Sequence, residues 1–214
     1  MSNQTSPYAR AQREGREALR RAILDAAGRL LAEYGPQALT VRRVAAEVGC
    51  STTVLYTMFG GKVGLADALY REGFERLTRR LEEAEKAHDA PEDPVARAAA
   101  LAIAYRESAL ADRNYYDVMF GRAIPGFEPS QESLAVGDAS LGMLADAVRE
   151  AMDAGVLIEG DPKAVAEVLW AAAHGVVSLE LAGHFTPEVA QDRYRTLCWA
   201  ALAPFLVGPE SGGG

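Results

Sequence analysis

Apolar and polar positions follow one another along the chain with the period of α-helices. Apolar residues recur three and four positions apart in segment after segment, and no segment shows the two-residue period of a β-strand. The pattern predicts helices at about 16–34, 62–86, 94–110, 112–120, 131–154, 162–183 and from 187 onward, with two short helices between 40 and 62. The sequence therefore predicts an all-α protein.

The stretch from 40 to 62 has the features of two helices joined by a sharp turn. Thr40 is suited to cap a first helix, and Gly49 can take the positive φ that a turn requires. Ser51 is suited to cap the second helix. Small Ala45 lets the two helices approach closely, and Leu55 can fix the second helix onto the first. This spacing is typical of a helix-turn-helix.

The second of these short helices has a packing side and a free side. Leu55, Met58 and Phe59 fall on one side. The other side carries hydroxyl groups and one phenol, on Thr52, Thr53, Tyr56 and Thr57. An ordinary solvated face carries Lys and Glu, whereas hydroxyls and methyls suit base edges and phosphates. The alternative is a helical hairpin with a merely polar surface, which the agreement of caps, turn glycine and packing positions disfavours.

Three short motifs extend this interpretation: Leu39-Thr40-Val41-Arg42, then Gly49-Cys50-Ser51, then Leu55-Tyr56-Thr57-Met58-Phe59-Gly60-Gly61-Lys62. With them, the chain from about Ile23 to Leu65 resembles the DNA-binding domain of TetR-family transcriptional regulators. Gly60-Gly61 departs from the family, which usually has Pro-Ser or similar before the lysine. The resemblance implies a three-helix DNA-binding domain whose contacts to DNA come from Thr40, Arg42, Arg43, Ser51, Thr52, Thr53, Tyr56, Thr57 and Lys62.

Charge is distributed unevenly between the two ends of the chain. The net charge is −8, from 22 Lys and Arg against 30 Asp and Glu. Up to Lys62 nine basic residues stand against five acidic ones, giving +4, so the remainder has 13 against 25, or −12. A basic segment of this kind fits a nucleic-acid partner. An N-terminal arm carries arginines that either contact phosphates or belong to a solvated, flexible segment, namely Arg10, Arg13, Arg16, Arg20 and Arg21.

The last two predicted helices indicate a protein interface. The helix at 162–183 is apolar nearly all round, so it must be buried on both sides, and its longest uncharged run, 168–179, is too short to cross a bilayer. Within it, the segment from Leu169 through Trp170 and His174 to Gly175 resembles the Trp-His-Gly segment of one group of TetR-family effector domains. That resemblance implies a four-helix dimer interface formed by the last two helices of two subunits, and a small-molecule cavity surrounded by helices four to eight.

The expected effector site combines an apolar wall with a few polar groups. Tyr105, Trp170 and His174 are its first candidates because each adds a polar group to an aromatic ring. The full expected lining is Tyr70, Phe74, Tyr105, Tyr116, Met119, Phe120, Met143, Trp170 and His174. Plain core packing is the alternative for most of these side chains. The sequence does not reveal the effector or the operator.

Catalysis and metal binding have little support. Glu85 and His88 have the spacing of one di-iron ligand pair, but such a site uses two pairs. Glu180 and His184 supply only two of the ligands that a metal needs. The sequence contains no phosphate-binding loop, nucleophile elbow or dinucleotide fingerprint. We therefore expect no enzyme, no cofactor and no metal.

The expected organisation is a DNA-binding domain with its arm at 1–62, a ligand-binding and dimerisation domain at 63–208, and a flexible tail at 209–214. The expected function is a homodimeric repressor that binds palindromic operator DNA and is released by a small-molecule effector. Two alternatives stay open: a DNA-binding dimer without an effector, and a helical-bundle binding protein or enzyme that merely retains the DNA-binding domain. The first residues lack the apolar core of a secretory signal, so we expect a cytoplasmic protein without a membrane partner.

Overall fold

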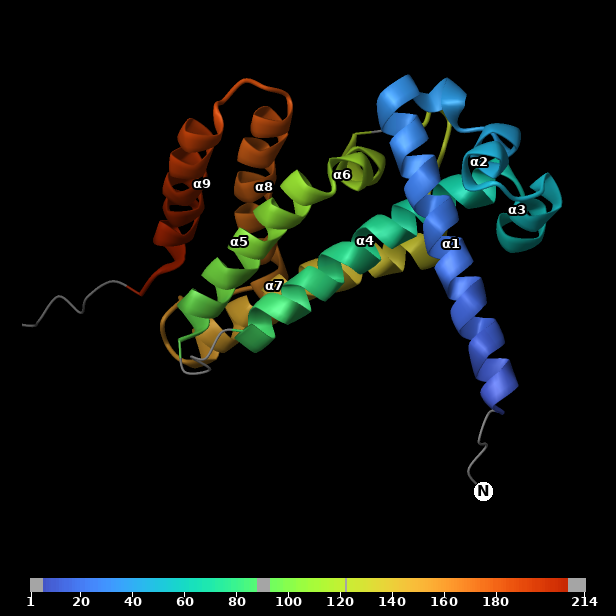
Figure 1. Cartoon of the computed structure of the whole chain (residues 1–214). Coiled ribbons are helices and arrows are strands. Elements are labelled where there is room, and N and C mark those ends of the chain that lie inside the picture. The colour runs from blue at the N-terminus through green and yellow to red at the C-terminus, as the bar shows by residue number, and fades with distance from the viewer. Residues whose placement is uncertain (1–5, 88–92, 122, 208–214) are drawn as a thin grey trace, which may run out of the picture. The chain divides into compact units, whose positions relative to one another are not determined.

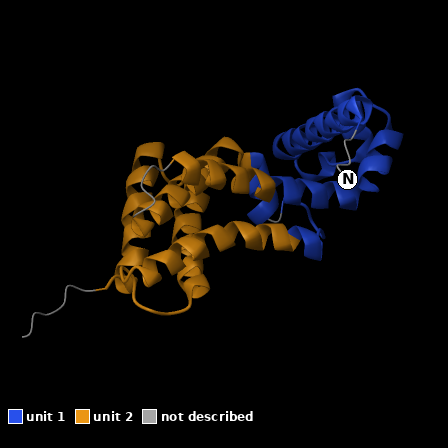
Figure 2. Cartoon of the chain, turned by 90° about the horizontal axis from the view of Figure 1, so that it is seen from below, with its two compact units in different colours: residues 1–73, 114–133 blue, residues 74–113, 134–214 orange. Residues whose placement is uncertain are grey.

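The computed structural model describes residues 6–87, 93–121 and 123–207, and this part of the chain is all-α, as predicted (Figure 1). The tail expected at 209–214 lies outside the described residues. The chain divides into two compact units, which Figure 2 colours separately: unit 1 is 1–73 with 114–133, and unit 2 is 74–113 with 134–214. The helices are α1 (Pro7–Tyr34), α2 (Val41–Val48), α3 (Thr52–Phe59), α4 (Lys62–Ala87), α5 (Pro94–Ala111), α6 (Arg113–Phe120), α7 (Gln131–Asp153), α8 (Pro162–Leu181) and α9 (Pro187–Leu202).

The core of unit 1 holds α1, α2, α3 and the first half of α4 together. Its largest fully buried side chains include Ile23, Leu39, Leu55 and Leu65. Burying such a side chain contributes about 1.5–3 kcal/mol relative to leaving it exposed. The later segment 114–133 joins this core, where the Tyr115 hydroxyl donates to an Asp25 carboxylate oxygen of α1 at 3.1 Å. Unit 1 is therefore larger than the DNA-binding domain expected from the motifs alone.

Helix α1 begins at Pro7, nine residues before the predicted start at Arg16. The Ser6 side chain accepts a hydrogen bond from the Ala9 backbone N–H, and Pro7 occupies the first helical position, where its missing N–H is not needed. The segment before Arg16 lacks an apolar stripe, so hydrophobic periodicity did not reveal it. The arginines of the predicted arm therefore belong to a helix that begins at Pro7.

The joint between α3 and α4 depends on glycines. Gly60 ends α3 with φ 71°, and Gly61 follows with φ 123°, both in the region that L side chains rarely adopt. Inside the first turn of α4, a Cβ on Gly64 would lie 1.8 Å from the carbonyl oxygen of Phe59. The two helices thus meet at a distance that only glycine permits. The two glycines that stand at 60–61, where the family usually has Pro-Ser, therefore permit this backbone conformation.

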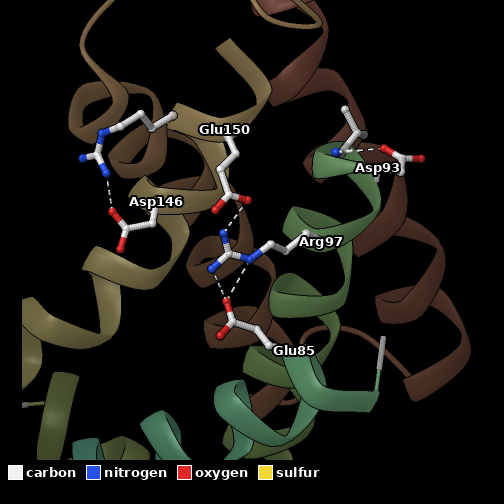
Figure 3. Close-up of polar contacts among 7 residues, drawn as sticks. Glu85, Asp93, Arg97, Asp146 and Glu150 are labelled. Atoms are coloured by element: carbon white, nitrogen blue, oxygen red, sulfur yellow. Dashed lines mark hydrogen bonds and ion pairs between the residues drawn. The ribbon is translucent and has the colours of Figure 1, made fainter. Parts of the chain in front are cut away.

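Unit 2 packs α5, α7, α8, α9 and the second half of α4. One core cluster joins α7 to α8 through Ala145, Val148, Ala151 and Ala166. Arg97 of α5 binds carboxylates from two other helices, contacting Glu85 of α4 through Nε at 2.9 Å and Glu150 of α7 through Nη1 at 2.7 Å (Figure 3). Burial lowers the pKa of this guanidinium, but hydrogen bonds and charge interactions with both carboxylates outweigh it and raise the pKa.

Helices α8 and α9 pack against each other and leave apolar side chains uncovered. The sequence predicted that α8 is buried on both sides, yet only 28% of its most apolar 18-residue stretch is buried within the single chain. Val168 and Leu179 of α8, and Leu197 and Trp199 of α9, are exposed. The length and composition of α8 would by themselves allow it to cross a membrane. The expected burial is thus unmet within one chain, and the exposed apolar side chains belong to the two helices that were predicted to form the dimer interface.

Candidate functional site

The helix-turn-helix of unit 1 has the local geometry that its sequence predicts. The Thr40 hydroxyl oxygen accepts a hydrogen bond from the Arg43 backbone N–H at 3.3 Å, which caps α2. Gly49 ends α2 with φ 75°, and the Cys50 N–H donates to the Ala45 carbonyl oxygen at 2.9 Å. Leu55 of α3 is 1% exposed and fixes α3 against this pair. The turn therefore holds α3 in one orientation with its other side outward.

The outward side of α3 is the candidate surface for DNA. Thr52, Thr53, Tyr56 and Thr57 are exposed, as the sequence predicts. Ser51 occupies the N-cap position with extended backbone, but its side chain makes no capping hydrogen bond, contrary to the expectation. Its exposed hydroxyl is thus left on the same surface. These hydroxyls and the phenol can donate and accept hydrogen bonds with bases and phosphate oxygens.

Exposed cationic side chains precede and follow α3 in the sequence. Arg42, Arg43 and Lys62 are all exposed. The Arg43 guanidinium carbon lies 4.2 Å from the centroid of the Tyr34 ring, a cation–π contact that orients the side chain without neutralising it. Lys62 is the first residue of α4, directly after the glycine joint. Exposed hydrogen-bonding groups and exposed positive charges in one stretch of the chain match the needs of a duplex, whose phosphates attract cations and whose base edges offer donors and acceptors.

Three of the side chains expected to line an effector site come together in unit 2. The Tyr105 hydroxyl and the His174 Nδ1 are 2.9 Å apart, joining α5 to α8. The Trp170 and His174 rings lie 5.5 Å apart between centroids. Burial lowers the pKa of His174, which favours the neutral imidazole, and the neutral ring can accept a hydrogen bond from the tyrosine hydroxyl at Nδ1. The result is a polar group set among aromatic rings.

The other six expected lining residues are divided between the units. In unit 1, the Tyr70 ring lies 6.2 Å from that of Phe127, and the Tyr116 and Phe120 rings lie 5.1 Å apart between centroids. Met119 also belongs to unit 1, where its sulfur lies beside Gly73. Phe74 and Met143 belong to unit 2, and the Phe74 ring lies against Gly137 of α7. Contacts thus join Tyr105, Trp170 and His174 within unit 2, and Tyr116 and Phe120 within unit 1.

The sequence did not reveal the ion pair between α5 and α8. Arg106 donates through Nε and Nη2 to the two carboxylate oxygens of Glu180 at 2.8 and 2.6 Å. Both oxygens of Glu180 are thus engaged by a cation, which removes the basis of the suggested metal pair with His184. Glu85 of the other suggested metal pair binds Arg97, and His88 lies outside the described residues. Among the described residues, no group of three or more potential metal ligands gathers.

A second unpredicted cluster joins α4 to the start of α7 within unit 1. Asp67 accepts hydrogen bonds from the Ser130 backbone N–H at 2.8 Å and from the Ser133 hydroxyl at 2.8 Å. Ser133 is 1% exposed, so its hydroxyl is satisfied by this carboxylate. A serine just before a helix and another in its first turn carry no pattern that indicates a distant aspartate, so sequence reasoning had no means to find the contact.

Two family models match the chain. Residues 23–69 match the bacterial regulatory proteins of the tetR family, and residues 98–202 match the tetracyclin repressor-like C-terminal domain. The first match covers the helix-turn-helix and the first part of α4. The second covers most of α5 through α9, including the contact between Tyr105 and His174. Among curated proteins, none matches the chain.

Solved structures share the fold over nearly the whole chain. A protein of unknown function from Rhodococcus sp. RHA1 is 31% identical, with a TM-score of 0.76 over 88% of this chain and 96% of that one. The TetR-family regulator PfmR from Thermus thermophilus is 19% identical, with a TM-score of 0.64 over 83% and 95%. SmeT in complex with triclosan is 24% identical, with a TM-score of 0.65 over 92% and 98%. The last two similarities concern the fold alone.

Proposed function

The chain belongs to the TetR family of bacterial transcriptional regulators, and we propose that it is a ligand-responsive repressor. In this proposal a homodimer binds palindromic operator DNA in the cytoplasm and leaves it when a small molecule binds. The observation that carries the proposal is the outward face of α3, with four exposed hydroxyl-bearing side chains that lie in the sequence between the exposed cations Arg43 and Lys62. An α-helix fits the major groove, where each base pair presents a distinct set of donors and acceptors.

Within the proposed complex the residues have separate roles. Thr52 and Thr53, in the first turn of α3, read base edges, because the first residues of a recognition helix approach them most closely. Tyr56 and Lys62 contact phosphates and set the register of the helix. The Tyr56 ring lies beside Gly61, since a Cβ at Gly61 would be 3.5 Å from it. The glycine joint thus supports the placement of both phosphate-binding groups.

Dimerisation is proposed through α8 and α9. Their exposed apolar side chains need a partner that excludes water, and a second copy offers the same apolar face. Two α3 helices must reach successive major grooves about 34 Å apart to bind both halves of a palindrome. A monomer would bind only one half-site, so dimerisation is part of the proposed DNA-binding mechanism.

The effector is proposed to bind unit 2 around Tyr105, Trp170 and His174, and to be an apolar or aromatic molecule with at least one hydrogen-bonding group. Support comes from the mixture of rings and polar atoms there. SmeT, which shares the fold, was solved with triclosan. Helix α4 carries Lys62 at its start and residues of unit 2 in its second half, so we propose that it transmits the coupling.

The test of DNA binding starts by selecting operators from a random duplex pool. Tyr56→Ala and Lys62→Ala should weaken binding to every sequence, and Lys62→Ala should lower the salt slope by about one. Thr52→Ala or Thr53→Ala should instead change which sequence is preferred. Arg149→Ala, which removes an exposed arginine from α7 of unit 2, is the matched control. If no duplex is enriched by the wild-type protein, the proposal of a DNA-binding regulator fails.

The test of the effector uses reciprocity. A ligand found by thermal-shift screening should bind free protein more tightly than operator-bound protein, by the same factor by which it weakens operator binding. A coupling of about 1–3 kcal/mol corresponds to a roughly 5- to 150-fold change. Trp170→Ala and Tyr105→Ala should reduce ligand affinity. Equal ligand affinity with and without operator would favour a regulator that has no effector.

A further inference from the structure

The first part of α1 forms an exposed helical extension, which we call the arm helix and define as residues 7–21. Every residue from Arg10 to Ala18 is exposed, and the first buried residue of α1 is Ile23. Figure 1 shows the dark-blue first part of α1 extending beyond α4 toward the N-terminus. A helix of about 12–15 residues is marginal alone in water, so the arm helix relies on its cap and on its continuity with the packed half of α1. Its exposure means that one side is available to a partner.

One face of the arm helix carries a stripe of arginines. Arg13, Arg16 and Arg20 are spaced three and four residues apart, which places them on one side of the helix. Continuing the same spacing beyond Arg20 leads to Leu24, Ala27 and Leu31, which are buried in the core of unit 1. The face of α1 that enters the core is thus apolar in its second half and cationic in its first half.

The arginine at the border is already paired. Arg20 Nη1 lies 3.1 Å from an oxygen of Glu72 on α4, and the side chain of Glu72 is 3% exposed. This ion pair fixes the rotation of α1 about its axis, because a buried carboxylate holds one guanidinium in place. Arg16 and Arg13, one and two turns further toward the N-terminus, are exposed on the same stripe. Their direction is therefore fixed by Arg20 and by the buried residues beyond it.

The two carboxylates of the arm helix do not cancel its charge. Glu14 is two residues from Arg16, which places it on the opposite side of the helix. Glu17 lies four residues after Arg13 and four residues before Arg21. A carboxylate interacts more favourably with a cation that follows it in the helix, so Glu17 favours Arg21 over Arg13. Five arginines against two glutamates leave the arm helix with a net charge of +3. A rigid helix with this charge is suited to bind a polyanion whose charges are regularly spaced.

We propose that the arm helix is a second DNA-contacting element, in which Arg13 and Arg16 bind duplex phosphates outside the bases read by α3. The inference rests on the proposed function, since it requires a protein that binds duplex DNA. It is supported by charge: the chain up to Lys62 carries +4, whereas the remainder carries −12. These contacts add sequence-independent affinity and extend the required DNA beyond the half-site.

The experiment compares two double variants that remove the same charge. Arg13→Ala/Arg16→Ala removes the stripe, and Arg10→Ala/Arg21→Ala removes two charges from the neighbouring face. Alanine keeps the helix, because it has the highest helix propensity. Operator affinity is measured from 50 to 200 mM salt, where each lost phosphate contact reduces the slope by about 0.9. The stripe variant should lose about two units of slope and bind roughly tenfold or more weakly at 0.1 M salt, while the matched variant changes far less.

Two further measurements separate a positioned contact from a general effect of charge. Trimming the duplex to the bases of the selected operator should abolish the difference between the stripe variant and wild type, because the flanking phosphates are gone. Ala18→Pro keeps every arginine but breaks the helix between the arm and the core, and should weaken binding to the longer duplex about as much as the stripe variant. Circular dichroism checks that the remaining helices are intact.

Three results would overturn the arm proposal. The first is an equal salt slope for the two double variants, and the second is an undiminished difference on the trimmed duplex. The third is a change in sedimentation of the stripe variant without DNA, which would assign the arm helix to the acidic part of a second copy. If wild type binds the operator and Tyr56→Ala weakens it while the stripe variant does not, only the arm proposal fails. If wild type binds no duplex, the proposed function fails as well.

Discussion

The outward face of the helix-turn-helix in unit 1 and the contact between α5 and α8 in unit 2 use their polar side chains in opposite ways. In the helix-turn-helix of unit 1, Thr53, Tyr56 and Lys62 are exposed to solvent. In unit 2, Arg106 and Glu180 form an ion pair in which the side chains are only 16% and 6% exposed. The polar groups of the first surface are available to another molecule. Those of the second hold α5 to α8.

This difference separates binding chemistry from packing chemistry. A side chain that binds a partner must be exposed and held in one orientation. In α3, a capped turn and one buried leucine hold the side chains in this way. A group that joins helices must satisfy its hydrogen bonds internally, because an unsatisfied buried polar atom costs about 1–3 kcal/mol. The Tyr194 hydroxyl, which donates to the Ala102 carbonyl oxygen at 2.5 Å, belongs to the second kind. Substitutions on the outward face of α3 should therefore affect DNA binding, and substitutions at the contact between α5 and α8 should affect stability.

The largest effect is expected at the exposed apolar side chains of α8 and α9. They belong to unit 2, yet we expect them to bind a second subunit rather than to pack within one chain. Leu197→Glu places a charge on a side chain that is 43% exposed in one chain, so the fold of the monomer should survive. Burying that charge in a dimer is costly, so the protein should sediment as a monomer and lose operator affinity by about 10²- to 10⁴-fold. Arg149→Glu, at an exposed position of α7 outside the proposed interface, is the control. A monomeric wild type at micromolar concentration would contradict the prediction.

A second experiment tests whether the ion pair of unit 2 contributes only to packing. Arg106→Met leaves the Glu180 carboxylate without its cation and should reduce the free energy of unfolding by about 3 kcal/mol. For a chain of this size, the melting temperature should then fall by about 6–12 °C. Adding Glu180→Leu should restore most of the loss, because no buried charge remains. Arg193→Met, whose partner Asp192 is exposed, should change stability by no more than about 0.5 kcal/mol.

The third experiment concerns the glycine joint behind the DNA-contacting surface. Gly64→Ala places a Cβ 1.8 Å from the Phe59 carbonyl oxygen, so α3 and α4 must separate. We expect a loss of about 2–3 kcal/mol in stability, with weaker operator binding because Lys62 and Tyr56 are displaced. Gly142→Ala on α7 is the matched control, since a Cβ there meets no atom within 4 Å and alanine favours a helix. Similar thermal unfolding of the two variants would show that the joint tolerates separation.

The same contrast explains which features the sequence could reveal. The helix-turn-helix was predictable because its determinants are local: Thr40 caps α2, Gly49 ends it, and Leu55 lies within the same stretch. The start of α1 was missed although Ser6 and Pro7 form a readable cap, because helices were identified mainly by an apolar stripe. The roles of the DNA-contacting and effector-binding residues stay predictions.

The contacts of unit 2 could not be predicted because their partners are distant in sequence. Arg106 and Glu180 are 74 residues apart, and Tyr105 and His174 are 69 residues apart. A period in the sequence shows that a helix has a buried side, but it does not show which other helix supplies the partner. For this reason Glu180 was considered as a metal ligand rather than as the partner of an arginine. The serines that bind Asp67 show the same limit within unit 1.

The smallest expected effect concerns protonation of His174, a polar group of unit 2 that the proposed effector would contact. Burial lowers its pKa in the folded protein below the ordinary value of 6.5. The unfolded chain therefore binds more protons between the folded pKa and 6.5, so stability is full above about pH 6.5 and falls as the pH decreases through that window. The loss should be modest, because solvent screens a half-buried group.

Chemical unfolding at a series of pH values would measure this contribution. His174→Gln cannot titrate but keeps an acceptor for the Tyr105 hydroxyl, so its stability should fall less than that of wild type as the pH decreases below 6.5. His184→Gln, which removes an exposed histidine between α8 and α9, is the matched control. If His174→Gln and wild type lose stability in parallel, then protonation of this imidazole does not differ between the folded and unfolded chain. The contact between Tyr105 and His174 would then be open to water, and it would resemble the polar surface of α3 more than the ion pair between Arg106 and Glu180.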